Sequence, residues 1–365
     1  MKKLKIGDVE SKPGELVCGY METISIPTGG AEMLPVMIAQ GEEEGPTFFL
    51  TANVHGNELT GVAVIHDVVT QELAERIKGT VVAIPSLNPT GLRLGTRNPT
   101  FDDRDPNRLF PEGRFKDEDA EDEDAQYPKP YEQVASKVYS LFDEHADYHI
   151  DIHNHSIRSI PYAIIDRVFY EGEEGKDEAK KLSDTQQEIV AAFGIMATAD
   201  FPAKKYLKLK YHRSLSGAVL NSLRIPAFTV ELGANTALFP EIVAGSVKGT
   251  RNALRWAGML DGSPERITEF DTPRPKKRIR RIEHPRAETA GIVKIVVDPG
   301  QHVEEGDPIA RFTDILGKPI GDGYIRTEHD GYMIALRSNM TVYTNDQVAE
   351  MGIEDDEPLI AEIPK

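Results

Sequence analysis

Short apolar runs alternate with helical patterns over most of the first 270 residues. The run at 47–54 is nearly unbroken, as expected for a strand that is covered on both faces. Apolar positions at helical spacing follow over about 58–78, and a second buried strand is predicted at 80–89. Such a strand–helix–strand unit normally pairs its two strands in parallel through a right-handed crossover.

Two strand-like runs precede this unit, and the alternation of strands and helices continues to about residue 260. Alternating helices and apolar strands are typical of a three-layer α/β domain, in which helices cover both faces of one sheet. We expect further strands near 14–26, 34–41, 147–153, 160–166 and 225–232, and helices near 131–146, 174–193, 214–224 and 239–260.

The pattern changes near residue 271. Prolines and a cluster of Lys and Arg at 271–286 predict a linker, whose charges we expect to pair with acidic groups of the same chain. Residues 287–365 show short β-like runs between turns and no convincing helix. The expected organisation is therefore an α/β domain at 1–270, a basic linker at 271–286 and a small all-β domain at 287–365.

Composition and charge exclude several classes of function. The formal net charge is −18, which argues against nucleic-acid binding because that needs a positive surface. No apolar run approaches the roughly 20 residues that span a bilayer, and no secretory signal is expected. The single Cys18 suits a reducing cytoplasm. The acidic stretch 116–126 is interpreted as a solvated, mobile loop rather than a cation site.

The stretch "TANVHGNELTG" (51–61) carries His55 and Glu58 directly after a predicted strand. Ligands bind at this edge of open α/β sheets, and side chains three apart on a helix share a face. The pair alone is a weak signal, because His-x-x-Glu arises often by chance. His153 ends the strand 147–153 and is a candidate third metal ligand, with His155 as a competing one.

A hydrolase would also need a base and a binding site for an anionic substrate. Glu231 ends an apolar strand, and an acid there is costly to bury without a role. The polar loop after residue 95 supplies Arg97, Arg104, Asn107 and Arg108, and an Arg beside an Asn is suited to clamp a carboxylate.

A second basic segment lies near the start of a predicted helix. His212 and Arg213 there are candidates for a further anionic contact, and a simple basic helix start explains them equally well.

Four motifs in order, "HGNE" (55–58), "DPNRLFP" (105–111), "DIHNH" (151–155) and "VELG" (230–233), resemble the succinylglutamate desuccinylase/aspartoacylase family. That family is a branch of the zinc carboxypeptidase superfamily. The resemblance runs through 47–260 and extends to the C-terminal part, which is similar to the family's barrel-like or lipoyl-like β domain. It implies a zinc-carboxypeptidase-like α/β fold with a mixed central sheet.

The resemblance also implies roles for individual residues. His55, Glu58 and His153 would bind one Zn²⁺ per chain. Glu231 would be the general base that activates the zinc-bound water, and Arg97 would polarise the scissile carbonyl.

The substrate loop matches the family with two departures. Asn107 and Arg108 match the pair that grips the substrate's α-carboxylate, although Pro106 replaces the usual leucine. The interval from Arg97 to Asn107 is longer than in aspartoacylase itself, so Arg104 remains a second candidate for the carbonyl role.

These residues together predict a zinc-dependent amidohydrolase that removes the acyl group from a small anionic N-acyl amino acid by attack of zinc hydroxide. Two alternatives stay open: a carboxypeptidase-like peptide or ester hydrolase, and a non-catalytic metal-binding adaptor. No nucleic acid and no membrane partner is expected, and a homo-oligomer is compatible with the sequence. Neither the acyl group nor the amino acid is fixed by the motifs.

Overall fold

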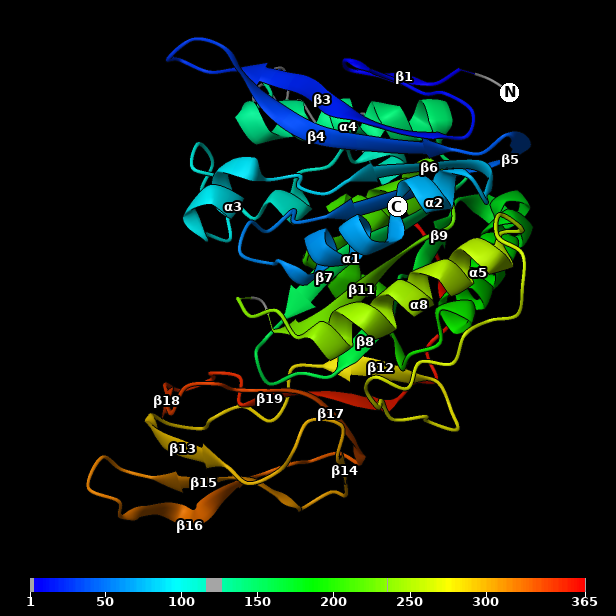
Figure 1. Cartoon of the computed structure of the whole chain (residues 1–365). Coiled ribbons are helices and arrows are strands. Elements are labelled where there is room, and N and C mark those ends of the chain that lie inside the picture. The colour runs from blue at the N-terminus through cyan, green and yellow to red at the C-terminus, as the bar shows by residue number, and fades with distance from the viewer. Residues whose placement is uncertain (1–2, 116–126, 235, 365) are drawn as a thin grey trace.

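The computed structural model describes residues 3–115, 127–234 and 236–364 (Figure 1). The acidic stretch 116–126, expected to be a solvated loop, lies outside the described residues.

A mixed sheet of twelve strands forms the centre of the described chain. The expected strand–helix–strand unit is confirmed, because its two strands, β5 and β6, pair in parallel. The next neighbour, β7, is parallel to both β5 and β11, whereas β8 is antiparallel to β11. In spatial order the strands are β14 (His302–Val303), β17 (Gly331–Leu336), β19 (Ala349–Glu354), β12 (Ile279–Ile282), β10 (Ala197–Ala199), β8 (Pro161–Ile165), β11 (Ala227–Ala234), β7 (Tyr148–His155), β5 (Glu43–Ala52), β6 (Lys78–Ile84), β4 (Ala31–Gln40) and β3 (Glu15–Ser25).

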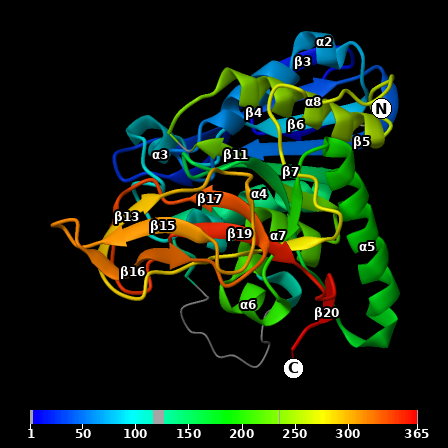
Figure 2. The same cartoon turned by 90° about the horizontal axis from the view of Figure 1, so that it is seen from below.

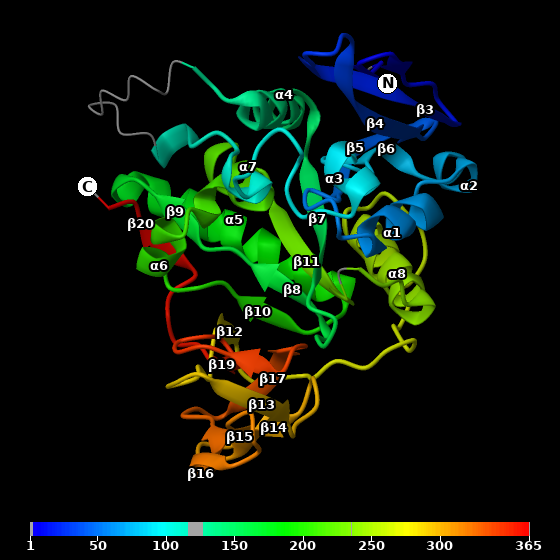
Figure 3. The same cartoon turned by 90° about the vertical axis from the view of Figure 1, so that its left-hand side faces the viewer.

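Helices pack on both faces of this sheet, which confirms the three-layer α/β architecture (Figures 1 and 3). One face packs on α1, α8 and the C-terminal part of α5, and the other on α4 and α7. The helices are α1 (Thr60–Val68), α2 (Gln71–Ala74), α3 (Pro89–Leu94), α4 (Pro130–His145), α5 (Gly172–Phe193), α6 (Ala203–Lys208), α7 (Leu215–Ser222) and α8 (Pro240–Trp256), with short 3-10 turns η1 (Pro106–Arg108), η2 (Gly113–Phe115) and η4 (Tyr211–Arg213).

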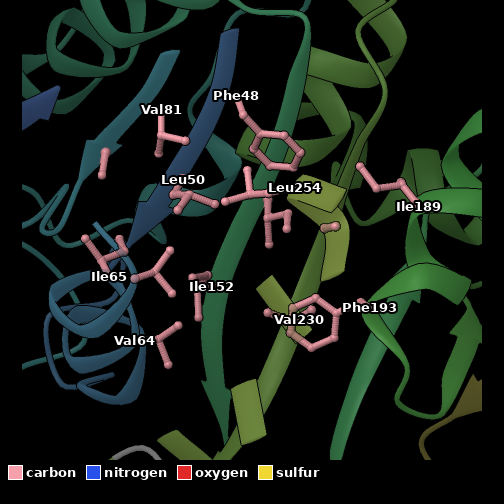
Figure 4. Close-up of a cluster of buried hydrophobic side chains, with 14 of the residues drawn as sticks. Phe48, Leu50, Val64, Ile65, Val81, Ile152, Ile189, Phe193, Val230 and Leu254 are labelled. Atoms are coloured by element: carbon pink, nitrogen blue, oxygen red, sulfur yellow. The ribbon is translucent and has the colours of Figure 1, made fainter. Parts of the chain in front are cut away.

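The core on the α1 side is built from the alternate residues of the central strands (Figure 4). Leu50, Ile152 and Val230 come from three neighbouring strands and meet Ile65 of α1 and Leu254 of α8. All five are at most 1% exposed, so the strands that end at the candidate site are held in a rigid, closely packed layer.

The helix predicted at 58–78 is two helices in the structure, which corrects the expectation of a single one. Val69 leaves the helical conformation, with φ −89° and ψ 80°. Thr70 then caps α2 by accepting a hydrogen bond from the Leu73 amide. The apolar spacing continued across this break, but β-branched residues and a Thr cap favour ending one helix and starting another.

Helix α1 lies unusually close to the sheet. A Cβ added at Gly61 would lie 2.7 Å from the Ala52 Cβ and 2.9 Å from the Ile152 Cγ2. Only glycine permits this approach, and it brings the start of α1 against the ends of the strands that carry the candidate ligands.

The described residues beyond 287 form strands and turns without a helix. Besides β14, β17 and β19, they form a four-stranded antiparallel sheet that lies below the central one in Figure 1 and nearest the viewer in Figure 2. Its strands are β16 (Pro319–Arg326), β15 (Pro308–Thr313), β13 (Gly291–Ile295) and β18 (Thr341–Val342), and two strand pairs, β1 (Lys5–Ile6) with β2 (Val9–Glu10) and β9 (Val168–Tyr170) with β20 (Ile360–Glu362), complete the fold.

The basic segment 271–286 contains a strand of the central sheet. Strand β12 pairs in parallel with β10 and antiparallel with β19, and so joins the two parts of the chain. The cations of the segment 271–286 have acidic partners within the chain: Arg281 pairs with Asp200 at 3.0 Å, and Arg278 pairs with Asp355 at 3.1 Å.

Among the described residues, none of the helices has both the length and the apolar character that a membrane span requires.

Candidate metal centre and active site

The three residues expected to bind a metal are brought together at one edge of the sheet. His55 Nδ1 lies 2.7 Å from Glu58 Oε1, and His153 Nδ1 lies 2.9 Å from Glu58 Oε2. One ligand atom from each residue lies within 4.8 Å of the others, and all three side chains are buried. His155, the competing candidate, instead faces Glu350 at 3.4 Å.

The turn that carries His55 and Glu58 is shaped by Asn53. Its φ of 57° is in the left-handed region, where Asn is one of the few tolerated residues. Its side-chain amide donates to the carbonyls of His55, Gly56 and Glu58, at 3.1, 3.0 and 2.8 Å. Gly56 is required for close approach, because a Cβ there would lie 2.2 Å from the Gly91 carbonyl carbon.

His55 and His153 each have a second carboxylate, which lies next to the Nε2 atom of the ring. Asp151 Oδ2 lies 2.8 Å from His153 Nε2, and Asp105 Oδ1 lies 3.0 Å from His55 Nε2. Burial alone would raise the pKa of both Asp carboxyl groups, but the adjacent histidines hold each pKa below its usual range. Such carboxylates fix the tautomer and orientation of metal-binding imidazoles.

This donor set fits a divalent metal ion. Two imidazole nitrogens and one carboxylate form a set that catalytic zinc accepts, with a further position left for water. Burial would raise the pKa of Glu58, yet the histidines on either side lower it, so Glu58 is an ionised carboxylate in a buried site. The residues His55, Glu58 and His153 could therefore hold the metal.

Glu231 lies beside the group formed by His55, Glu58 and His153. It pairs in register with His153 across parallel strands β11 and β7, and it lines the same cavity. Its Oε2 atom is buried without a hydrogen-bond partner, and burial raises the pKa of this carboxyl group. A carboxylate that is partly shielded from solvent and lies beside the candidate metal ligands is placed to exchange a proton with a bound molecule.

The loop arginines differ in where they point. Arg97 lines the cavity and lies 3.3 Å from Glu58 Oε1 and 3.2 Å from Asp105 Oδ2. Arg104 does not line it, because its guanidinium is held by Asp102 at 2.8 Å and by Glu132 at 3.2 Å. The structure thus brings Arg97 to the cavity and leaves Arg104 outside it, which favours Arg97 of the two candidates for the carbonyl role.

Asn107 and Arg108 both line the cavity. The Asn107 amide is anchored by the Leu215 amide, which donates to its Oδ1 at 2.8 Å, and its Nδ2 lies 3.4 Å from His153 Nε2. The Arg108 guanidinium stacks on the Tyr211 ring at 3.9 Å. The two residues of the predicted clamp therefore lie beside the candidate metal ligands, and their role as a clamp stays a prediction.

The second basic segment agrees with the simpler of the two expectations, because His212 and Arg213 lie in the 3-10 turn η4 directly before α7. Neither His212 nor Arg213 lines the cavity, and Arg213 donates to the Phe110 carbonyl and pairs with Glu112. Tyr211 is the residue of this segment that reaches the cavity.

The cavity has a volume of about 380 Å³. One of its walls is formed by residues that follow position 280. Sequence reasoning missed these residues because β12 and β19 meet the α/β domain only through long-range pairing. Buried charges inside short β-like runs were the available signal. The residues of this wall are Arg281, Glu283, Gln347 and Glu350.

Comparisons with known proteins agree with this fold. A curated relative, the N-alpha-acetyl-L-2,4-diaminobutyric acid deacetylase of Halomonas elongata, is 26% identical over 326 residues, covering 88% of this chain and 85% of the relative. A crystal structure of a succinylglutamate desuccinylase from Silicibacter sp. TM1040 has a TM-score of 0.73 at 20% identity, over 97% and 98% of the two chains. The product-bound ectoine utilization protein EutE (DoeB) of Ruegeria pomeroyi has a TM-score of 0.72 at 21% identity, over 96% and 98%. Residues 44–257 match the model of the succinylglutamate desuccinylase/aspartoacylase catalytic domain. The chain therefore belongs to the succinylglutamate desuccinylase/aspartoacylase family.

Proposed function

We propose that the protein is a zinc-dependent amidohydrolase that releases the acyl group from an N-acyl amino acid. The observation that carries this proposal is the position of Glu231. Glu231 lines the cavity next to a buried His–Glu–His group that fits a metal ion, and its Oε2 atom has no hydrogen-bond partner.

The chain's own residues divide the reaction among them. A bound Zn²⁺ would supply a Lewis acid that lowers the pKa of a water molecule to about 7. Glu231 takes a proton from the attacking water and returns it to the nitrogen of the leaving amine, so that a carboxylic acid and a free amino acid are formed. Arg97 donates hydrogen bonds to the oxygen of the amide carbonyl, where negative charge develops.

The α-carboxylate of the substrate binds to Asn107 and Arg108. Stacking on Tyr211 holds the Arg108 guanidinium in one orientation, which reduces the entropy lost on binding. These positive groups attract an anionic substrate locally, although the whole chain has a formal charge of −18.

The Halomonas elongata relative supports the substrate class. That protein is a deacetylase of an Nα-acetylated amino acid, and its similarity extends over 88% of this chain. We therefore place an N-acyl amino acid, rather than a peptide or an ester, first among the substrates to be tested.

Substitution of Glu231 tests the proposal. Glu231→Gln keeps the shape of the side chain but removes its basicity. We expect kcat for N-acetyl amino acids to fall at least 100-fold with unchanged zinc content, because a general acid–base group contributes about 10²- to 10⁴-fold.

Glu241→Gln is the matched control, since it makes the same change at an exposed position in the first turn of α8. It should retain wild-type rates. Full activity of Glu231→Gln would remove Glu231 from the mechanism, and hydrolysis of no N-acyl amino acid by zinc-loaded wild-type protein would remove the proposed function.

A further inference from the structure

A second group of side chains that suit a metal ion lies outside the active-site cavity. His284 belongs to the segment between β12 and β13, and Glu328 and His329 belong to the turn between β16 and β17. One ligand atom from each of the three lies within 4.8 Å of the others. In the ranges that the structure describes, only this group and the active-site group bring three His, Cys, Asp or Glu side chains so close together.

The spacing of the group is that of ligands around an ion. His284 Nε2 and Glu328 Oε2 are 3.6 Å apart, which is too long for a hydrogen bond. Two ligand atoms on one tetrahedral zinc ion, each about 2.1 Å from the metal, are about 3.4 Å apart. The rings of His284 and His329 meet edge to face, with their centroids 5.2 Å apart. An ion can therefore be bound between these side chains with little movement of the chain.

The backbone that carries the three side chains is held in place. Pro285 follows His284 and is buried, and its carbonyl accepts a hydrogen bond from the Val348 amide at 2.9 Å. The turn is fixed by the buried Thr327, whose hydroxyl donates to the His329 carbonyl at 2.9 Å and accepts from the His329 amide at 3.1 Å. Such a preformed frame lowers the entropy that is lost when a ligand binds.

The group is also accessible and in a suitable protonation state. His284 and Glu328 line a second cavity of about 370 Å³, and the Glu328 side chain is 78% exposed. Burial lowers the pKa of His284, and the nearby Glu328 carboxylate opposes this only in part. The His284 imidazole is therefore neutral at neutral pH and loses no proton when it binds a metal.

We propose that His284, Glu328 and His329 form a second site for a divalent transition-metal ion, separate from the active site. Two imidazoles and one carboxylate suit Zn²⁺ or Ni²⁺, whereas Ca²⁺ and Mg²⁺ prefer oxygen ligands. The bound ion links the segment between β12 and β13 to the turn between β16 and β17. It therefore stabilises the fold and takes no part in hydrolysis.

Two features make this second site weaker than the active-site group. His284 Nδ1 is buried without a hydrogen-bond partner, whereas each active-site histidine has a carboxylate at its second ring nitrogen. Such carboxylates raise metal affinity about 10- to 100-fold. The exposed Glu328 is also less fixed in orientation than the buried Glu58. The second site therefore fills after the first.

A calorimetric zinc titration gives the first test. The full chain, without a histidine tag, is stripped of metal and titrated with Zn²⁺ at neutral pH, and hydrolysis is followed in parallel. We expect two binding steps of one equivalent each, the second about 10-fold or more weaker than the first, with hydrolysis complete after the first. Titration with Ca²⁺ should show no second step. A single zinc step, or a second step that Ca²⁺ reproduces, overturns the proposal.

Substitutions locate the second step. Glu328→Gln and His329→Gln should each weaken it about 10-fold or more and leave the first step and kcat within about threefold. His302→Gln is the matched control, because His302 is an exposed histidine of β14 whose ring packs on Tyr332. It should keep both steps. An unchanged second step in the two ligand variants, or its loss in the control, overturns the proposal.

Thermal unfolding tests whether the bound ion stabilises the fold. The Tm is measured at one equivalent of Zn²⁺ and at a free concentration ten times the second dissociation constant. Occupation of a site present only in the folded chain should raise the wild-type Tm by about 2 °C between these two conditions. This rise should be absent in His329→Gln and kept in His302→Gln. Binding of the second equivalent without a rise in Tm would contradict the proposed link between the two segments.

Discussion

Substitution of Asp151 tests whether the carboxylate behind His153 supports metal binding. Asp151 is fully buried, and its Oδ2 lies 2.8 Å from His153 Nε2 while its Oδ1 accepts from the Thr51 hydroxyl at 2.6 Å. Asp151→Asn keeps an oxygen that can accept from His153 and an amide that can donate to Thr51. The change therefore removes the charge while the shape and the hydrogen bonds are retained.

The expected effect on zinc affinity is a loss of about 10- to 100-fold, equal to about 1.4–2.7 kcal/mol. The structure gives the reason. Burial alone would lower the pKa of His153, but the carboxylates of Asp151 and Glu58 raise it well above its usual value. Removing one of these charges makes the imidazole less basic and hence a weaker donor to a cation.

The assay is competition for zinc against a chromophoric chelator at alkaline pH, because displacement of a proton from His153 interferes less as the pH rises. Asp102→Asn is the matched control, since Asp102 is also buried but pairs with Arg104 outside the cavity. It should leave zinc affinity within about threefold. Wild-type affinity in Asp151→Asn, or an equal loss in Asp102→Asn, would refute the reasoning.

Three further results are expected. Gly61→Ala should lower the free energy of unfolding by about 1–3 kcal/mol in urea titration, because the new Cβ overlaps the sheet; unchanged stability would show that α1 can move away. Arg97→Met should reduce kcat/KM about 100-fold or more, as the loss of an oxyanion donor does. Arg104→Met should keep kcat/KM within about threefold of the wild-type value. A larger loss in Arg104→Met than in Arg97→Met would assign the carbonyl role to Arg104. The ion pair of Glu350 and His155 should stabilise the fold by about 2–3 kcal/mol, and comparison with Glu350→Gln measures it. Burial would raise the pKa of Glu350, but His155 lowers it to about 2, so this stability is present above about pH 4.5 and is lost as the pH falls toward 2. Glu350 conversely raises the pKa of His155 against the effect of burial, so the contribution fades again as the pH rises through that raised value; a difference that is flat with pH would contradict the pairing.

The parts of the fold and site that could be predicted from the sequence depend on local pattern or on contiguous motifs. Strands β5, β7 and β11 were recognisable as apolar runs, and each has a polar candidate residue in or just after its C-terminal part. The parallel pairing of β5, β7 and β11 then brings His55, His153 and Glu231 together.

What could not be predicted depends on contacts between distant segments. The break at Val69 was hidden by continuous apolar spacing. Asp105 was visible in the "DPNR" motif, but its contact with His55, 50 residues away, follows from the path of the loop. Arg281 was assigned to a linker because its partner Asp200 is 81 residues distant in sequence.

The pairing of β8 with β11 illustrates the same limit. Asp166 ends an apolar strand just as Glu231 does, yet only the antiparallel register of β8 with β11 shows that both line one cavity. Register is a long-range property that a single strand's pattern does not determine. The predicted domain boundaries stay a prediction, and the structure adds that β12 joins the sheet across them.

The measurement that most directly tests the central claim is a zinc titration of the metal-free protein. Protein stripped with a chelator is given increasing zinc, and hydrolysis of a panel of N-acetyl amino acids is followed together with bound metal. The account predicts that activity rises in proportion to zinc and reaches a plateau at about one equivalent per chain, with His153→Ala showing neither this tight binding nor activity. Full activity of the stripped protein, or stoichiometric zinc binding without hydrolysis of any N-acyl amino acid, would contradict it.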